Sequence, residues 1–339
     1  MRLIAIVAAL LVGSGAAHAQ QPEKRDVHIA VGGKSALYYL PLVITERLNY
    51  FKDEGLNVRI SDFAGGTRSL EAVVGGSADV VSGAYEHTIN MQSRKQNFQA
   101  FVLMGAAPQI SVAIASKLAS NYKSPKDLKG LKVGISAPGS STNMVINYVL
   151  AQGGLKPTDV AIIGVGAGAS VIAAIDQGRV DVISQTDPAV TMLEKAGKVK
   201  VIAETRTPEG TQKLFGGPMP AASLYAPIEF VKRNPNTAQA LTNATLRALI
   251  WMQDASPQQI LNTVPEEYLL GNKAMYLFAY NNVKTAYSKD GYFSEAGART
   301  TLKALASFNP NVKPQAINLA QTYTNEFVKK AHAKLDRKK

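Results

Sequence analysis

The residues best suited to bind a ligand lie in loops that combine glycine with hydroxyl side chains. Glycine lets backbone N–H groups approach a ligand closely, and each serine or threonine adds a hydroxyl that can donate a hydrogen bond. Where such a loop begins a helix, the unpaired N–H groups of the first turn also favour an anion. The loops supply Ser35, Thr67, Ser140, Ser141 and Thr142.

Each of these hydroxyls also has a purely structural interpretation. Thr67 can cap a helix over residues 68–74, and residues 140–142 can cap a helix that begins at Asn143. The choice is open for any single residue. Because the same type of loop occurs in both halves of the pattern described below, we expect the set as a whole to bind a ligand.

Further candidates have similar alternatives. Tyr38 and Tyr39 can form the wall of a pocket or pack in the core. Asp187 can accept a hydrogen bond from a ligand amine or hydroxyl, or it can cap the helix that follows it. The remaining candidates, at the end of a strand-like run, are Ala84, Tyr85 and Glu86.

The sequence carries no pattern expected for catalysis. Cysteine is absent, and none of the four histidines has a partner at the spacing of a metal site or a catalytic triad. The loop at residues 65–67 lacks the lysine of a P-loop and the spacing of a dinucleotide-binding fingerprint, and no Gly-x-Ser-x-Gly elbow occurs. We therefore predict a binding protein with no cofactor and no metal, rather than an enzyme.

The loops are positioned by a strand–helix pattern that occurs twice. Gly-x-x-Asp-Val-[Val/Ile]-Ser stands at residues 76–82 and again at 178–184, and a glycine precedes the aspartate by 13 residues in both copies. Alternating strands and helices predict right-handed βαβ units with parallel sheets. The first copy predicts strands at 27–31, 56–60 and 79–82 with helices at 41–54 and 68–74. The second predicts strands at 131–135, 160–165 and 181–184 with helices at 143–152 and 170–177.

Two copies predict two related lobes. Strand-like runs at 109–115 and 221–226 are the expected crossovers, so residues 20–108 plus 222–339 form lobe 1 and residues 109–221 form lobe 2. From Asn234 onward the pattern is helical, with expected starts at 234–235, at the capping box Ser256–Gln259, and at 313–314 for a helix that runs to about 334. We expect this tail to pack on lobe 1. Ligands of parallel sheets bind at the carboxyl ends of the strands, which is where the glycine and hydroxyl loops lie.

The first residues predict export. Leu3–Val12 is an apolar run of signal-peptide length, and Ala17-His18-Ala19 is a small-x-small cleavage pattern, so we expect the mature chain to begin at Gln20. The formal charge of the 339-residue chain is +12, but the basic residues are scattered, which argues against nucleic-acid binding. We expect a soluble protein of the bacterial periplasm.

The segment Pro41–Val58 resembles the signature of the nitrate/sulfonate/taurine-type periplasmic binding proteins, in which a helix ends in an aromatic pair and leads through Glu-Gly-Leu to the second strand. The Gly-Gly-Thr loop, the Gly-x-x-Asp-Val strand and Leu128–Gly134 are also similar to that family. The resemblance covers residues 27–226. Leu48-Asn49 departs from it, because the family has a small residue and a glycine before the aromatic pair.

The resemblance implies an α/β fold of the two-lobed periplasmic binding protein type (type II-like), with a hinged cleft and a helical C-terminal tail on lobe 1. It implies capture of a small solute, such as a sulfonate, a carboxylate or a pyrimidine-like compound, by a monomer. The partner would be the permease and ATPase complex of an ABC transporter. Two alternatives stay open, an enzyme on the same scaffold (pyrimidine-forming or chorismate-handling) and a periplasmic ligand sensor. Positions that match the family's ligand contacts are Ser35, Thr67, Ala84, Ser140, Ser141 and Asp187.

Overall fold

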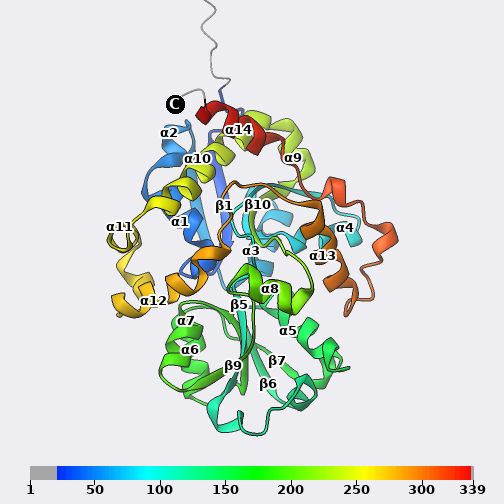
Figure 1. Cartoon of the computed structure of the whole chain (residues 1–339). Helices are drawn as coiled ribbons and strands as arrows, with labels where there is room; N and C mark the ends of the chain where they lie inside the picture. The colour runs from blue at the N-terminus through cyan, green and yellow to red at the C-terminus, as the bar shows by residue number, and fades with distance from the viewer. Residues whose placement is uncertain (1–20, 337–339) are drawn as a thin grey trace, which may run out of the picture.

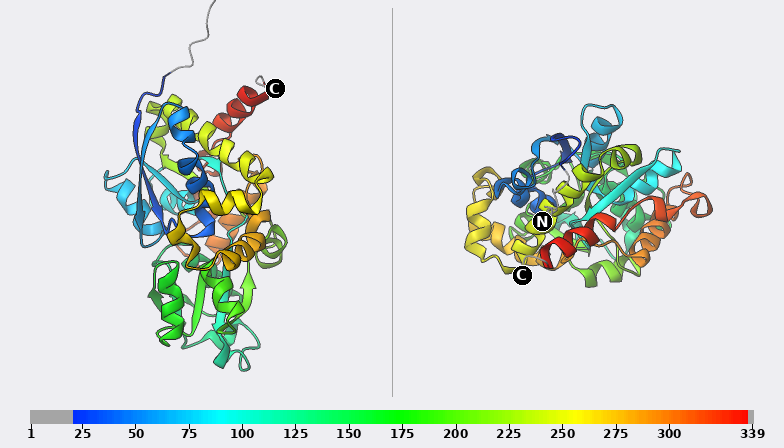
Figure 2. Two further views of the ribbon diagram at one scale, coloured as in Figure 1. Left: turned by 90° about the vertical axis from the view of Figure 1, so that its left-hand side faces the viewer. Right: turned by 90° about the horizontal axis from the view of Figure 1, so that it is seen from above.

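The computed structural model describes residues 21–336 and confirms the predicted α/β fold. Two five-stranded sheets, each flanked by helices, form two lobes that stack along the long axis of the molecule (Figure 1). The side view in Figure 2 shows the same two lobes, with the red C-terminal helix at the end of lobe 1 far from lobe 2. The predicted signal segment and its cleavage site lie outside the described residues.

The sheet of lobe 1 is mixed, with four of its five strands running in the same direction. Strand β1 pairs in parallel with β2 and β3, while β10 runs antiparallel to β3 and β4. Helices cover both faces, so β1 reads as a nearly continuous apolar run whose Ile29 and Val31 are fully buried. The strands in spatial order are β2 (Asn57–Phe63), β1 (Asp26–Gly32), β3 (Val80–Ala84), β10 (Ala222–Pro227) and β4 (Phe98–Leu103).

The sheet of lobe 2 repeats this arrangement. Strand β6 pairs in parallel with β7 and β8, and β5 runs antiparallel to β8 and β9. The two predicted crossover strands therefore occupy the same position in the two sheets. The strands in spatial order are β7 (Ala161–Gly164), β6 (Lys132–Ile135), β8 (Val182–Thr186), β5 (Ile110–Ala115) and β9 (Val199–Glu204).

The helices of the two copies confirm most of the expected elements. In lobe 1 they are α1 (Leu40–Arg47), α2 (Tyr50–Asp53), α3 (Gly66–Val74) and α4 (Glu86–Ser93), preceded by the 3-10 turn η1 (Leu37–Tyr39). In lobe 2 they are α5 (Ser141–Gln152), α6 (Ala169–Asp176), α7 (Ala189–Lys195) and α8 (Pro208–Phe215). The tail holds α9 (Ile228–Arg233), α10 (Pro235–Asp254), α11 (Pro257–Thr263), α12 (Lys273–Val283), α13 (Glu295–Ala306) and α14 (Glu326–Asp336).

Two predicted helices are wrong in extent. The helix expected over 41–54 breaks into α1 and α2 because Asn49 takes a left-handed conformation with φ 58°. The helix expected from 313 to 334 exists only as α14, after two short 3-10 turns. The backbone around Thr322 pairs instead with the edge of β4, where Ala100 N–H donates to the Thr322 carbonyl at 3.0 Å and Thr324 N–H donates to the Ala100 carbonyl at 2.8 Å.

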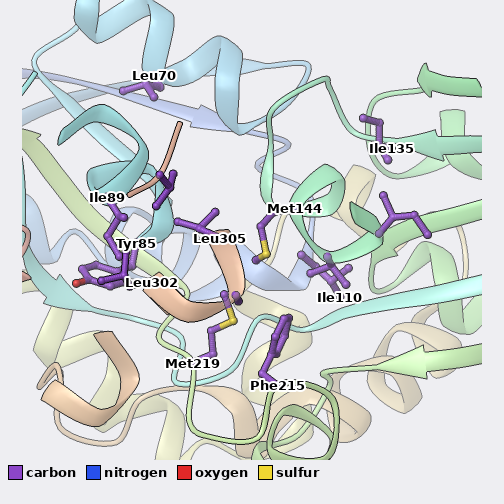
Figure 3. Packing of buried hydrophobic residues seen from close by; sticks show 14 of the residues in the cluster. Leu70, Tyr85, Ile89, Ile110, Ile135, Met144, Phe215, Met219, Leu302 and Leu305 are labelled. Carbon is purple, nitrogen blue, oxygen red and sulfur yellow. The ribbon is translucent and has the colours of Figure 1, made fainter. Parts of the chain in front are cut away.

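The helical tail packs on lobe 1, as expected, and also touches lobe 2. Helix α10 contacts α1, α2 and β4, whereas α12 contacts α7 and α13 contacts both α4 and α5. Figure 3 shows the apolar cluster to which α13 contributes Leu302 and Leu305, together with Ile89 of lobe 1 and Met144 of lobe 2. One apolar cluster therefore spans both lobes and the tail.

The boundaries between the lobes stay a proposal, with residues 20–108 and 222–339 assigned to lobe 1 and 109–221 to lobe 2. Among residues 21–336, no helix combines the length and the apolar character needed to cross a membrane.

The end of β1 has no room for a side chain. A Cβ added to Gly32 would lie 2.2 Å from the carbonyl carbon of Gly65 and 2.3 Å from the nitrogen of Gly66. Gly32→Ala should therefore lower the free energy of unfolding by about 3 kcal/mol, since backbone atoms cannot move aside as a flexible side chain can. Gly164→Ala is the control, because its nearest atom would be Pro138 Cδ at 3.6 Å. Chemical denaturation measures both variants, and equal stabilities would contradict the prediction.

Candidate functional site

A small cavity of ≈ 30 Å³ lies between the two lobes, at the carboxyl ends of β1, β6 and β8. Both lobes contribute to its wall, which contains no lysine, arginine, aspartate or glutamate side chain. The lining residues are Gly32, Ala36, Tyr38, Tyr39 and Gly66 from lobe 1, and Ile110, Ser136, Ser140, Ser141, Thr142, Ala167, Gln185 and Thr186 from lobe 2. Its position is the one that the strand–helix pattern predicts for a ligand site.

A larger open groove of ≈ 880 Å³ lies on lobe 1, between the start of the described chain, α2, α10 and α14. Its wall includes Glu23, Glu54, Lys330 and Lys334 and comes from one lobe only. None of the glycine and hydroxyl loops singled out by the sequence reaches it. We therefore take the interlobe cavity as the candidate site.

The N-termini of two helices, one from each lobe, meet at the cavity. Helix α3 begins at Gly66 and α5 begins at Ser141. Thr67 N–H donates to Ser140 Oγ at 3.0 Å, and the two hydroxyl oxygens lie 3.2 Å apart. Ser140 occupies the N-cap position of α5, but its side chain does not cap that helix. The structural interpretation expected this hydroxyl to cap its own helix. Instead, it joins the two lobes.

The other hydroxyls of the α5 loop hold the loop together. Thr142 Oγ1 accepts a hydrogen bond from Ser136 N–H at 3.0 Å and lies 2.8 Å from Ser136 Oγ. Ser35 faces the opposite lobe at the rim of the cleft, since a Cβ on Gly168 would lie 3.4 Å from Ser35 Oγ. Ser35 and Thr67 stand close to the cavity without forming its wall.

The two neighbouring tyrosines of η1 form the aromatic wall. The rings of Tyr38 and Tyr39 lie edge to face at 4.8 Å, and both side chains are buried. The Tyr38 hydroxyl has no hydrogen-bond partner among the described residues. Because a buried hydroxyl without a partner is unfavourable, this oxygen is available to a ligand in the cavity.

Three predicted site residues have side chains elsewhere. Ala84 packs in the core of lobe 1. The Tyr85 hydroxyl pairs with Thr322 Oγ1 at 2.6 Å, and its ring packs against Phe293. Asp187 Oδ1 accepts from Thr191 N–H at 2.8 Å, as the capping interpretation expects. The structure thus brings Tyr38, Tyr39 and residues 140–142 to the cavity wall and gives these three side chains other partners.

Asp187 is also half of a buried ion pair. Arg206 Nε donates to Asp187 Oδ2 at 2.8 Å, and both side chains are buried. The same guanidinium reaches Glu194 at 3.0 Å and Glu204 at 3.3 Å. The Asp187 carbonyl accepts Leu37 N–H at 2.9 Å, so this charged cluster of lobe 2 touches lobe 1 directly before the tyrosine wall.

Glu86 and His87 begin α4 behind the cavity wall. Glu86 is one of the candidates that the sequence offers after the third strand, whereas His87 is not among them. Glu86 is only 2% exposed and its Oε1 has no hydrogen-bond partner among residues 21–336. Burial raises the pKa of Glu86 to about 7, with the Ser141 side chain and the Glu86 backbone N–H acting in the opposite direction. The place of His87 after β3, at the same sheet edge as the loops, is the signal that could have included it.

His87 is held neutral by its surroundings. Its Nδ1 lies 2.7 Å from the Tyr225 hydroxyl, while its Nε2 has no partner among the described residues. Burial, together with a smaller contribution from nearby Arg94, lowers the pKa of His87 to about 4. A Cβ on Gly66 would lie 3.0 Å from His87 Cε1 and 3.8 Å from Ser140 Oγ, so the ring stands beside the contact between the lobes. Between residues 21 and 336, no group of three His, Cys, Asp or Glu side chains could hold a metal ion.

Two α/β lobes with this strand order, closing on a cavity at the carboxyl ends of their strands, have the fold of the solute-binding proteins of ABC importers. Residues 36–260 match the family model "NMT1/THI5 like", so the chain belongs to this family.

Solved structures of similar proteins share this fold. One from Bordetella bronchiseptica RB50 is 53% identical, covering 94% of this chain and all of that chain with a TM-score of 0.92. The alkanesulfonate-binding protein SsuA from Xanthomonas axonopodis pv. citri, bound to MOPS, is 17% identical over 89% of this chain and 99% of its own, with a TM-score of 0.67. The periplasmic nitrate-binding protein NrtA from Synechocystis PCC 6803 is 14% identical over 94% of this chain and 90% of its own, with a TM-score of 0.73.

Removing Arg206 should destabilise the protein strongly. Arg206→Met leaves the buried Asp187 carboxylate without its cation, and we expect a loss of about 3–5 kcal/mol in the free energy of unfolding. Arg68→Met is the matched control, since its pair with Glu71 is exposed and should change stability by about 0.5 kcal/mol or less. Adding Asp187→Asn to Arg206→Met should recover part of the loss. Urea denaturation tests all three variants. A loss below about 1 kcal/mol for Arg206→Met would show that the Asp187–Arg206 pair is not a buried ion pair that the fold depends on.

Glu86 should make stability depend on pH in a known direction. Because its pKa rises from 4.5 to about 7 on folding, its favourable contribution is complete below pH 4.5 and is lost as the pH rises through 7. This difference corresponds to about 3 kcal/mol at most. Glu86→Gln should therefore gain thermal stability over the wild type at pH 8 and little at pH 4.5, measured by calorimetry without added solute. Glu71→Gln, at an exposed carboxylate of α3, should show no such pH-dependent gain.

Proposed function

We propose that the protein captures a small organic anion, a sulfonate or a carboxylate, in the interlobe cavity and releases it unchanged to the permease and ATPase of an ABC importer. It would act as a monomer in the periplasm, after cleavage of the signal near Ala19. The observation that carries the proposal is the meeting of the α3 and α5 N-termini from opposite lobes at Thr67 and Ser140. First-turn N–H groups have no partner within their own helix and favour negative charge.

The names of the structural neighbours support this class of ligand. SsuA is an alkanesulfonate-binding protein and NrtA is a nitrate-binding protein, and both ligands are oxyanions. The cavity wall adds hydroxyls and an amide that can donate hydrogen bonds in a site shielded from water. The described residues that line the cavity include no pair of nucleophile and base, which agrees with capture of the solute without chemical change.

Capture requires the lobes to open and close. A cavity of ≈ 30 Å³ has little room beyond a water molecule, and the lobes touch directly through the Thr67–Ser140 hydrogen bond. A solute would enter an open form and replace this contact, so that Thr67 N–H donates to the solute instead. Hinge motion at the two connections between the lobes, near residues 104–109 and 216–221, would then close the cleft around it.

Removing the two facing hydroxyls should weaken binding. The double variant Ser140→Ala/Thr67→Ala loses two hydrogen-bond donors, and we expect affinity to fall tenfold or more without loss of folding. A thermal-shift screen of sulfonates and carboxylates selects the solute, and isothermal titration calorimetry then measures its affinity.

The matched control is Ser93→Ala/Thr263→Ala, because both hydroxyls bond only to carbonyls of their own helices, at 2.7 and 2.8 Å. This control should bind as the wild type does. An unchanged affinity in the Ser140/Thr67 variant would argue against these loops as the binding site.

A further inference from the structure

Glu86 is a buried acid at the contact between the lobes, with no cation beside it. Its neighbours are Tyr38 and Tyr39 of η1, Tyr225 of β10 and Ser141 of lobe 2. Within the described part of the chain, no lysine or arginine forms a salt bridge with it, and its Oε1 has no hydrogen-bond partner. An ionised carboxylate in this position would be 2% exposed and without a cation among the described residues, which is costly in a protein interior.

The polar atoms around Glu86 also favour its neutral, protonated form. Among the described residues, the Tyr38 hydroxyl is buried without a partner in the cavity wall, and that wall holds no basic side chain that could offset a second negative charge. An anion at the N-termini of α3 and α5 would therefore be repelled by an ionised Glu86. A protonated Glu86 instead places no charge behind the wall, and the Tyr38 hydroxyl in the wall can donate to an acceptor oxygen of the oxyanion.

We propose that the cavity binds an oxyanion together with one proton, which Glu86 holds as a neutral carboxylic acid directly behind the cavity wall. This inference rests on the proposed function and specifies its ligand chemistry. No covalent bond changes, because solvent or buffer supplies the proton and Glu86 releases it when the oxyanion leaves.

The groups around Glu86 leave it as the one that titrates near neutral pH. Burial raises the pKa of Tyr38, Tyr39 and Tyr225, so these phenols stay neutral. Burial lowers the pKa of His87 to about 4, so its ring stays neutral above pH 5, and Ser141, which α5 places beside Glu86, does not titrate. With the pKa of Glu86 raised to about 7, the acid is protonated at pH 5.5 and must take up a proton on binding at pH 8.5.

The opposite chemistry predicts the opposite pH dependence. If Glu86 bound a ligand amine or other cation, it would act as a carboxylate, and affinity would rise with pH as the proton is lost. For an oxyanion with linked proton uptake, affinity falls by about tenfold per pH unit above 7. The sign of the change therefore distinguishes the two ligand classes.

Isothermal titration calorimetry of the wild type tests the proposal with methanesulfonate, ethanesulfonate and benzoate as probes at pH 5.5, 7 and 8.5. At pH 8.5 each titration is repeated in two amine buffers of different ionisation enthalpy, Tris and triethanolamine, which gives the number of protons taken up. We expect about one proton per bound oxyanion at pH 8.5 and none at pH 5.5. This count needs no variant, so it stands even if changes at Glu86 impair folding.

Glu86→Gln keeps the shape of the side chain and removes the titration, so its affinity should be equal at pH 5.5 and 8.5, with no proton uptake. Glu71→Gln should keep the wild-type pH dependence. Binding without proton uptake at pH 8.5, an affinity that rises with pH, or a pH dependence that survives in Glu86→Gln would each overturn the inference.

The same experiment separates this inference from the proposed function. Binding of the oxyanions without proton uptake overturns the proton-linked site and leaves the proposed function intact, whereas binding of neutral or cationic solutes alone, tested with amines and polyols, overturns both. Failure of the oxyanions, amines and polyols alike would refute the proposed function and the inference together.

Discussion

The contact between Thr67 N–H and the Ser140 hydroxyl is the interaction on which the arrangement of the site depends. It joins two helix N-termini whose partial positive charges face each other across the cleft, an arrangement that favours a negative group between them. Only small residues allow so close an approach. Gly32 has no space for a Cβ against Gly65 and Gly66, and a Cβ on Gly65 would lie 2.8 Å from Ala137 Cβ of the other lobe. The glycine pattern is therefore a requirement of closure as well as of local turns.

Local signals made much of the fold predictable. Gly76 and Gly178 end helices at φ 76° and 64°, a conformation that glycine adopts without strain, so their matched spacing indicated two copies of one unit. Long-range pairing was not predictable from such signals. The residues around Thr322 follow the edge of β4, more than 200 positions earlier in the chain, and this pairing replaced the helix expected there. The sequence pattern also missed β4 and β9, which lie outside the repeated unit.

The same holds for the candidate site: residues set by a local sequence pattern could be predicted, whereas residues set by contacts distant in sequence could not. The hydroxyl loops could be found because glycine and serine at strand ends are a local pattern, and five of the ten predicted residues line the cavity. Asp187 has the right position in sequence, but Arg206, which lies 19 residues further along, holds its side chain in lobe 2. Glu86 presents the reverse case. Glu86 matters because, among the described residues, its Oε1 has no hydrogen-bond partner. This can be seen only in the folded protein, where η1, β10 and lobe 2 bury the side chain.

The placement of Tyr38 connects the cavity to the rest of the molecule. Leu37, the residue before it, donates its N–H to the Asp187 carbonyl of lobe 2 and accepts the Tyr287 hydroxyl of the tail at 2.8 Å. The same corner of lobe 2 receives Asn282 of α12, whose Nδ2 donates to Thr191 Oγ1 at 3.2 Å. In the closed arrangement, the segment that carries the aromatic wall is therefore held by contacts among η1, the Asp187 corner of lobe 2 and the helical tail. Because Glu86 lies behind that wall, closure also determines how far water can reach its carboxyl group, which is why the charge of this acid and the position of the lobes should change together.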